Sequence, residues 1–201
     1  MGPAAPVSGF DDGLIRFFGV NPMVFTSRAA ACVLVVGSIN VDLYHRVGQG
    51  TVRFGGGAPV DVCSIKGQTL PAASFARSAR IAPQLAQLTA GSEEAFVLSM
   101  DGPFDQKTGG KGANAAAAAG QTARCEFLGN LGALSEVENR RLLADLAKYG
   151  AVRTERCAVR DGVPTGTAFI LSFSDGDNAI LLIGGANQDW PSSKELAPPA
   201  M

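Results

Sequence analysis

Residues 108–119 read TGGKGANAAAAA, and this glycine-rich stretch running into alanines is the most informative segment of the chain. Glycines let the backbone approach a ligand closely, and alanine favours helix, so we expect a helix to begin directly after the glycines. A helix N-terminus has unpaired N–H donors and partial positive charge, which suits an anion or a polyhydroxyl ligand. Lys111 adds a cation, and Asn114 adds a donor and an acceptor. The alternative on spacing alone is a turn into a helix that only packs.

The stretch does not match the common nucleotide-binding patterns. A Walker A loop requires Gly, four residues, and then Gly-Lys-Ser/Thr. Here Asp105 stands where the first glycine would be, and Gly112 follows the lysine. The dinucleotide fingerprint Gly-x-Gly-x-x-Gly is also absent at this point, so the pattern favours another kind of ligand.

An apolar run at 32–36, CVLVV, predicts a strand buried on both faces of a parallel sheet. It is followed by Gly-Ser-Ile-Asn-Val-Asp, which ends at Asp42. In open α/β sheets, ligands bind beyond the carboxyl ends of strands, where Asn40 and Asp42 are expected. Two residues apart in extended chain, these side chains project to the same side and suit adjacent sugar hydroxyls. The alternative is an Asx-type turn that closes the strand.

Taken together, these motifs resemble the ribokinase-like (PfkB) carbohydrate kinases, and within them the ribokinases. The resemblance covers residues 32–187 and rests on several motifs in order. They are the strand and turn 33–42, the step 67–71 (GQTLP), the signature 109–114 (GGKGAN), the stretch 162–168 (GVPTGTA) and the closing 184–187 (GGAN).

The resemblance implies a three-layer α/β/α, Rossmann-like sheet with a small β lid. It implies that Asn40, Asp42, Gly110, Lys111 and Asn114 contact the sugar. It further implies an ATP-dependent sugar kinase that uses Mg²⁺ and K⁺, with D-ribose as substrate and a homodimer formed through the lid. Fructokinase-type and adenosine kinase-type activities are the alternatives within the family.

The chain also departs from the family pattern. The family's catalytic aspartate lies in a Gly-Ala-Gly-Asp stretch, and no such stretch occurs here, so no catalytic residue is assigned. Gln68 replaces the usual glutamate, and Gly132 is followed by Ala-Leu instead of two aspartates. We therefore expect a truncated kinase without the C-terminal part, the catalytic Asp and the nucleotide site, inactive by itself. The alternatives are a non-catalytic sugar-binding or regulatory module, and a truncated product without a stable fold.

The expected organisation has three parts. Residues 1–31 form an N-terminal extension, disordered or loosely docked. Residues 32–187 form the N-terminal portion of a carbohydrate kinase domain, with an insertion at 76–107. Residues 188–201 form a tail. The extension resembles an organellar transit peptide only weakly because it contains paired acids, and a cytoplasmic protein is the expectation.

Composition narrows the functional classes. The formal net charge is −1 and no basic cluster occurs, which argues against nucleic acid as a partner. No apolar run approaches the length of a membrane span. The four cysteines form no Cys-x-x-Cys pair, which predicts reduced and mostly buried thiols. No metal ligands are assigned, since Asp175 and Asp177 are expected to form an exposed turn.

Local patterns predict further elements. Residues 43–75 should hold the lid strands, and 77–89 a helix interrupted by a proline. The sequence at 135–138 (SEVE) predicts a capping box for a helix that continues to Tyr149. Residues 167–173 and 179–183 predict a hairpin. Apolar residues at helical spacing should face the sheet; they are Leu142, Leu143, Leu146 and Ala147.

Overall fold

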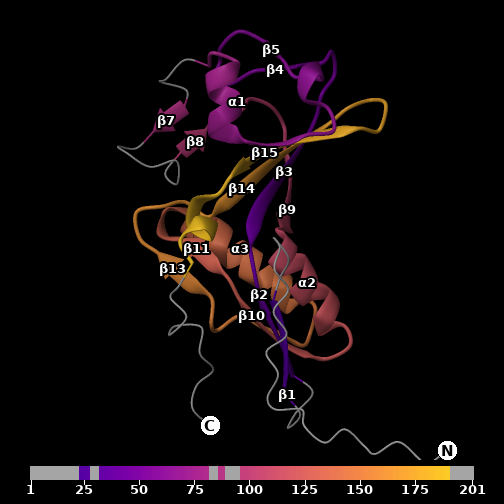
Figure 1. Cartoon of the computed structure of the whole chain (residues 1–201), viewed down its shortest axis with the longest axis vertical. Coiled ribbons are helices and arrows are strands. Elements are labelled where there is room, and N and C mark those ends of the chain that lie inside the picture. The colour runs from indigo at the N-terminus through magenta and orange to yellow at the C-terminus, as the bar shows by residue number, and fades with distance from the viewer. Residues whose placement is uncertain (1–22, 28–31, 82–85, 89–95, 191–201) are drawn as a thin grey trace, which may run out of the picture.

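The computed structural model describes residues 23–27, 32–81, 86–88 and 96–190 (Figure 1). The α/β class expected from the sequence is confirmed, because parallel and antiparallel strands combine with α-helices. The strands are β1 (Met23–Ser27), β2 (Cys32–Val36), β3 (Asn40–Arg46), β4 (Thr51–Val52), β5 (Val60–Asp61), β6 (Thr69–Pro71), β7 (Ala86–Leu88), β8 (Phe96–Leu98), β9 (Asp105–Gly109), β10 (Arg124–Leu128), β11 (Asn130–Gly132), β12 (Val152–Arg153), β13 (Ala158–Arg160), β14 (Gly166–Ser172) and β15 (Asn178–Ile183). The helices are α1 (Ala72–Ser78), α2 (Lys111–Gly120) and α3 (Glu136–Ala147), with 3₁₀ turns η1 (Cys63–Ile65), η4 (Ala133–Ser135) and η5 (Gly185–Gln188).

A four-stranded sheet with the order β1-β2-β10-β12 forms one end of the molecule (Figure 1). Strands β2, β10 and β12 are parallel, and β1 pairs with β2 in the antiparallel sense. Helices α2 and α3 pack on one face of this sheet and share a core with it. That core contains Val35, Ala116, Phe127, Leu142 and Leu146. Among the described residues, two of the three expected layers are therefore present.

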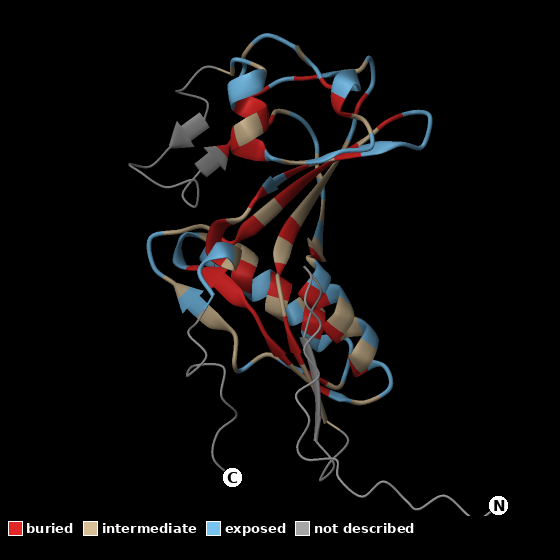
Figure 2. Cartoon of the chain, viewed as in Figure 1, coloured by how far each residue is buried: buried red, intermediate tan, exposed pale blue. Residues whose placement is uncertain are grey.

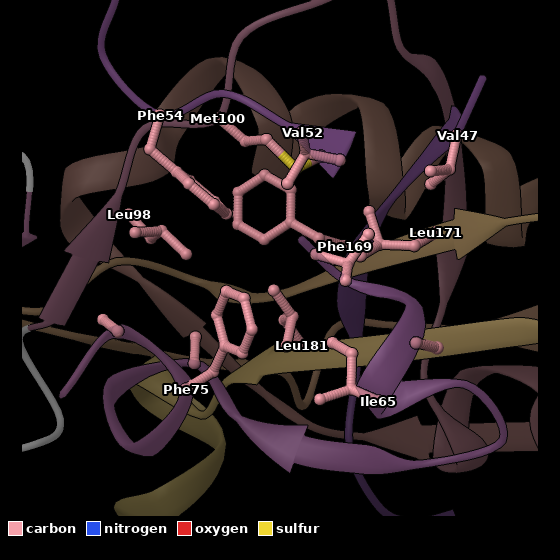
Figure 3. Close-up of a cluster of buried hydrophobic side chains, with 14 of the residues drawn as sticks. Val47, Val52, Phe54, Ile65, Phe75, Leu98, Met100, Phe169, Leu171 and Leu181 are labelled. Carbon is pink, nitrogen blue, oxygen red and sulfur yellow. The ribbon is translucent and has the colours of Figure 1, made fainter. Parts of the chain in front are cut away.

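A five-stranded sheet with the order β6-β15-β14-β3-β9 forms the middle of the molecule. Strands β14 and β3 are parallel, whereas β9 and β15 run antiparallel to their neighbours. One face of this sheet packs against α1 and the β4–β5 ribbon (Figure 1). The packing is a second apolar core, in which Phe54, Phe75, Phe169 and Leu181 gather (Figure 3).

Strand alternation explains how one face of the second sheet is buried. In β14, Phe169 and Leu171 face the second core, and Leu181 of β15 lies beside them and is fully buried. On the opposite face, Leu182 remains exposed. Figure 2 shows buried residues along both sheets and on the helix faces that pack against them. Because β3 belongs to this sheet and β2 to the other, the three residues 37–39 connect the two sheets.

Several local predictions are confirmed. The run 32–36 is strand β2, the helix expected directly after the glycines is α2, which includes the alanine run, and β14 and β15 form the expected hairpin. Helix α3 also forms, but the capping box is wrong. The Ser135 side chain makes no capping bond to the helix; instead its hydroxyl accepts a hydrogen bond from Thr165 N–H (3.0 Å).

Two other local predictions are wrong. The helix expected over 77–89 is not formed, because residues 86–88 are strand β7 and the nearby helix α1 ends at Ser78. Ala147 was expected to face the sheet, yet it is exposed, while Leu142 and Leu146 are buried. Helix α3 therefore presents a narrower apolar face than the residue spacing indicated.

The segments expected at 1–31, 76–107 and 188–201 can be compared with the observed strands. Residues 23–27, inside the expected extension, form strand β1, and residues 1–22 and 28–31 lie outside the described residues. The end of the expected insertion forms strand β9 beside β3. The tail beyond residue 190 also lies outside the described part. None of the helices described is long and apolar enough to cross a membrane.

The four cysteines are free, as the sequence predicts. Their burial is more varied than expected, since Cys125 is buried, Cys32 and Cys157 are intermediate, and Cys63 is exposed. Burial raises the pKa of the Cys157 thiol to about 11. These thiols are therefore scattered single groups, without a partner for a disulfide.

Candidate functional site

Asn40 and Asp42 lie at the start of β3, where the chain passes from the first sheet to the second. The strand β2 ends at Val36, and the amide of Gly37 donates to the carbonyl of Leu128 (3.1 Å) before β3 begins at Asn40. Two residues apart on one strand, the Asn40 and Asp42 side chains lie on the same face of the sheet. The connection between the sheets thus places a carboxamide and a carboxylate side by side.

Asp42 has an electrostatic environment that marks it as a candidate binding residue. Its Oδ1 atom is buried and has no hydrogen-bond partner among the described residues. Loss of water raises the pKa of Asp42 to about 6, because burial disfavours the charged form. A buried acceptor without a donor is unfavourable, so a hydroxyl group that donates to Oδ1 would be stabilised there.

Gly109, the last residue of β9, makes room for this carboxylate. A Cβ atom at residue 109 would lie 1.8 Å from Asp42 Oδ2, which no real side chain permits. Gly109 pairs with Asn40 across the antiparallel β3–β9 ladder. The Asp42 carboxylate therefore lies directly over the first glycine of the glycine–lysine corner, residues 109–112.

The other glycines of this corner allow the start of α2 to lie in close backbone contact with the β2–β3 connection. Gly110 has a φ of +92°, which favours glycine, and a Cβ there would lie 2.7 Å from the carbonyl oxygen of Ser38. A Cβ at Gly112 would lie 2.4 Å from the carbonyl carbon of Gly37. The amide of Ala113 donates to the Ser38 carbonyl (3.0 Å). Close backbone contact thus fixes where α2 begins.

Lys111 and Asn114 occupy the first turn of α2, and both are exposed. Gly110 contacts the backbone of residues 38–39, which directly precede Asn40. Lys111 is the next residue in the glycine–lysine corner. Asn114 lies further along the helix and lines a hollow of about 490 Å³ with Thr108 and Asp145. Neither Asp42 nor Lys111 lines that hollow. Of the five residues predicted from the sequence, Asn114 is the one that lines this hollow.

Sequence reasoning missed Lys107, which lies opposite Asp42 in the β3–β9 ladder and on the same face. Its Nζ is 3.3 Å from Asp105 Oδ2 and 4.8 Å from the centre of the Tyr44 ring. Both members of the Lys107–Asp105 pair are exposed, and such pairs contribute about 0–1 kcal/mol, so Lys107 is free to exchange partners. A second cation is therefore available beside Asp42.

Sequence reasoning also missed the role of Asn187, which it placed only in a closing motif. Asn187 belongs to η5, and its side chain makes three hydrogen bonds with residues 39 and 40. Its Oδ1 accepts from Ile39 N–H (3.1 Å), and its Nδ2 donates to the Ile39 carbonyl (2.9 Å) and to Asn40 Oδ1 (2.8 Å). These contacts join the end of the hairpin to the start of β3.

A buried polar network holds the start of β14 next to this site. Thr165 Oγ1 accepts from Gly132 N–H (2.8 Å) and donates to Asn139 Oδ1, and Asn139 Nδ2 donates to the Gly132 carbonyl (2.8 Å). Thr165 and Asn139 are both buried. The network precedes Gly166, the β14 residue that pairs with Asn40, and so connects α3 to the candidate site.

The described residues contain no group of three or more His, Cys, Asp or Glu side chains that could hold a metal ion. Asp175 of the hairpin loop forms an ion pair with Lys66 (2.5 Å), and Asp177 Oδ1 accepts from the Asn178 amide (2.8 Å). Asp175 therefore has a lysine partner from another segment, and Asp177 has a backbone partner within the hairpin. Consequently, no described residue is assigned to Mg²⁺, K⁺ or ATP.

No family model matches the sequence, and no curated protein matches it.

Solved structures similar to the model include three ribokinases. The ribokinase of Cryptococcus neoformans in complex with ADP is 24% identical, with a TM-score of 0.48 over 82% of this chain and 38% of that one. The ribokinase of Giardia lamblia is 22% identical, with a TM-score of 0.49 over 83% and 36%. The ribokinase of Arabidopsis thaliana with ribose and ATP is 24% identical, with a TM-score of 0.45 over 84% and 41%. The chain thus spans about two fifths of the length of these structures.

Proposed function

We propose that this chain binds a monosaccharide between the start of β3 and the glycine–lysine corner, as the sugar-binding part of a ribokinase-like carbohydrate kinase. Asn40 and Asp42 would bind adjacent hydroxyls. Lys111 would supply a cation, and the backbone at Gly110 would allow close approach. Asn114 would contact the sugar from the first turn of α2. The order of the family motifs in the sequence supports this assignment.

The observation that carries the proposal is the burial of the Asp42 carboxylate and the surroundings of its two oxygen atoms. Its Oδ1 is buried and has no hydrogen-bond partner within the described part of the chain, and its Oδ2 lies over Gly109, next to the exposed start of α2. A carboxylate held this way can accept hydrogen bonds from two hydroxyl groups. Buried carboxylate oxygens are normally hydrogen-bonded, so an oxygen without a protein partner beside a helix N-terminus is a place where a ligand hydroxyl can donate.

For the whole protein we propose ATP-dependent phosphorylation of a sugar, with D-ribose as the substrate. Such a transfer needs positioned groups and electrostatic stabilisation of the phosphoryl group. No described residue of this chain is assigned to the nucleotide, to Mg²⁺ or to K⁺. The contribution of this chain is to bind and orient the acceptor sugar. A homodimer formed through the lid belongs to the same proposal.

Calorimetry with D-ribose tests the site on the chain itself. We expect saturable heat for the wild type and at least tenfold weaker binding for Asp42→Ala. Asp161→Ala, an exposed aspartate outside the site, is the matched control and should bind as the wild type does. Absence of ribose heat from a cooperatively folded wild type would reject the sugar site.

The same preparation distinguishes the alternatives. A non-catalytic sugar-binding module would be stabilised by ribose on heating and would not consume ATP in the presence of Mg²⁺. A fructokinase or adenosine kinase type would prefer fructose or adenosine over ribose in the calorimeter. ADP formation that depends on ribose would support kinase activity of the chain itself.

A further inference from the structure

Asn187 has an amide orientation that the backbone alone determines. The Ile39 amide nitrogen can only donate, and the Ile39 carbonyl oxygen can only accept. Asn187 Oδ1 must therefore face the amide (3.1 Å), and Asn187 Nδ2 must face the carbonyl (2.9 Å). The amide of an asparagine is otherwise ambiguous, but here two unambiguous backbone groups assign it.

The orientation of Asn187 in turn determines that of Asn40. The second hydrogen of Asn187 Nδ2 points to the Asn40 side chain at 2.8 Å, so the Asn40 atom at that position must be the acceptor Oδ1. Asn40 Nδ2 is then directed away from Asn187, and it makes no hydrogen bond with a described residue. Both of its hydrogens remain available to a ligand.

We propose, building on the sugar site above, that Asn187 is a positioning residue that makes Asn40 a hydrogen-bond donor beside the Asp42 acceptor. One donor next to one acceptor is complementary to a vicinal diol. One hydroxyl of the diol donates to the carboxylate, and its neighbour accepts from Asn40 Nδ2. The site therefore selects sugars with adjacent free hydroxyls and disfavours deoxy sugars that lack one of the two.

The hydrogen bonds that run from Ile39 through the Asn187 amide to Asn40 form a relay, and Gly166 preserves the space that this relay requires. A Cβ atom at residue 166 would lie 2.0 Å from Asn187 Nδ2 and 2.7 Å from Asn40 Oδ1. Because Gly166 pairs with Asn40 in the parallel β14–β3 ladder, the strand pairing holds this open space next to the two amides. The relay thus depends on three segments that are distant in sequence.

The ligand-free protein provides the first test, by NMR of the asparagine side-chain amides. Both Asn187 Nδ2 hydrogens should exchange slowly with water, since both are hydrogen-bonded, and those of Asn40 should exchange fast. In Asn187→Asp the carboxylate can only accept, so Asn40 should turn its Nδ2 toward residue 187 and exchange more slowly. Slow exchange of the Asn40 amide in the wild type would overturn the proposal.

Affinity for D-ribose provides the second test, through the order of two variants. Asn187→Ala removes the relay but leaves Asn40 free to rotate, so ribose affinity should fall about threefold. Asn187→Asp holds Asn40 in the reversed orientation, so affinity should fall at least tenfold. A purely structural role predicts instead that the loss of affinity follows the loss in the free energy of unfolding in both variants, so urea unfolding of each variant is the companion measurement. Affinity losses that only follow stability, or a larger loss in Asn187→Ala, would overturn the proposal.

Asn40→Ala tests the Asn40 amide directly and does not depend on the folding of residue 187 variants. The alanine side chain can neither donate to nor accept from the sugar. It should therefore lose discrimination between D-ribose and 2-deoxy-D-ribose or 3-deoxy-D-ribose at the hydroxyl that Asn40 binds. Asn178→Ala, the same change in the exposed hairpin, is the matched control. Unchanged discrimination in Asn40→Ala would overturn the proposal.

Amide exchange reports on the orientation of Asn40, and ribose binding reports on the sugar site, so the two can fail separately. If the exchange pattern is as expected and the wild type binds no ribose, the sugar site fails and the amide orientation stands. If the wild type binds ribose and Asn40 exchanges slowly before ribose is added, the sugar site stands and the relay fails.

Discussion

The carboxylate of Asp42 occupies the space that any side chain at residue 109 would need. The ideal Cβ position at Gly109 lies 1.8 Å from Asp42 Oδ2 and 2.1 Å from Asp42 Cγ. The two residues belong to neighbouring strands, β3 and β9, whose antiparallel pairing brings them together. The glycine is therefore required by a contact with a specific charged side chain, and its own backbone conformation is not the reason.

Gly109→Ala should accordingly separate binding from folding. The Asp42 side chain can rotate away, so we expect a stability loss of only about 1 kcal/mol, the central value for point substitutions. Ribose affinity should fall at least tenfold, because the carboxylate leaves the glycine–lysine corner. Urea unfolding and calorimetry measure the two effects. Gly48→Ala, at a site with nothing within 4 Å of the new Cβ, is the control. Wild-type affinity in Gly109→Ala would contradict the placement of Asp42.

Asp42 should make stability and binding respond to pH in opposite directions. Its folded pKa of about 6 lies above the ordinary aspartate pKa of 3.8, so the folded state holds a proton more tightly than the unfolded chain does. The free energy of unfolding should therefore decrease as pH rises from about 4 to 6. Ribose affinity should instead increase over the upper part of this range, because the ionised carboxylate is the better acceptor.

Asp42→Asn isolates this effect. At pH 7 the variant should be more stable than the wild type by about 1–2 kcal/mol, because no charge is buried, and the difference should vanish near pH 4. Asp161→Asn, which changes an exposed aspartate, should follow the wild type at every pH. Urea titrations at several pH values measure the effect. A variant that is less stable than the wild type at pH 7 would show that Asp42 has an unrecognised partner.

Thr165→Val tests the buried network that connects α3 to the candidate site. Valine keeps the shape but leaves Gly132 N–H without its acceptor and Asn139 Oδ1 without its donor. We expect a loss of about 2–3 kcal/mol in the free energy of unfolding, since unsatisfied buried groups are costly. Thr122→Val removes an exposed hydroxyl bond to Ala119 and should change stability by less than about 0.5 kcal/mol. Equal stability of both variants would contradict the burial of the network.

The cysteines should differ sharply in reactivity. Cys63 is exposed, whereas Cys125 is buried, and burial raises the pKa of both Cys125 and Cys157. Because the thiolate is the reactive form, a disulfide reagent at pH 8 should label Cys63 quickly, and Cys125 and Cys157 only on unfolding. Cys63→Ser should remove the fast phase of labelling. A fast phase that persists in Cys63→Ser would place another thiol at the surface.

Much of the local structure could be predicted because its signals are local. The apolar run 32–36 became β2, and the glycines before an alanine run became the start of α2. The capping box failed because Ser135 had a competing partner, the amide of Thr165. The helix over 77–89 failed because residues 86–88 pair with β8, a contact that helical spacing does not report.

The sequence by itself determined which residue types stand at the glycine–lysine corner and at the start of β3, since backbone freedom, helix preference and side-chain chemistry are properties of short segments. Only the tertiary structure decided which of these groups meet. Asn187 bonds to Asn40 across 147 positions of the chain, and the β3–β9 pairing places Asp42 over Gly109. Such contacts depend on how the sheets pair and pack, because a hydrogen bond requires atoms within about 3 Å and no local pattern encodes that distance.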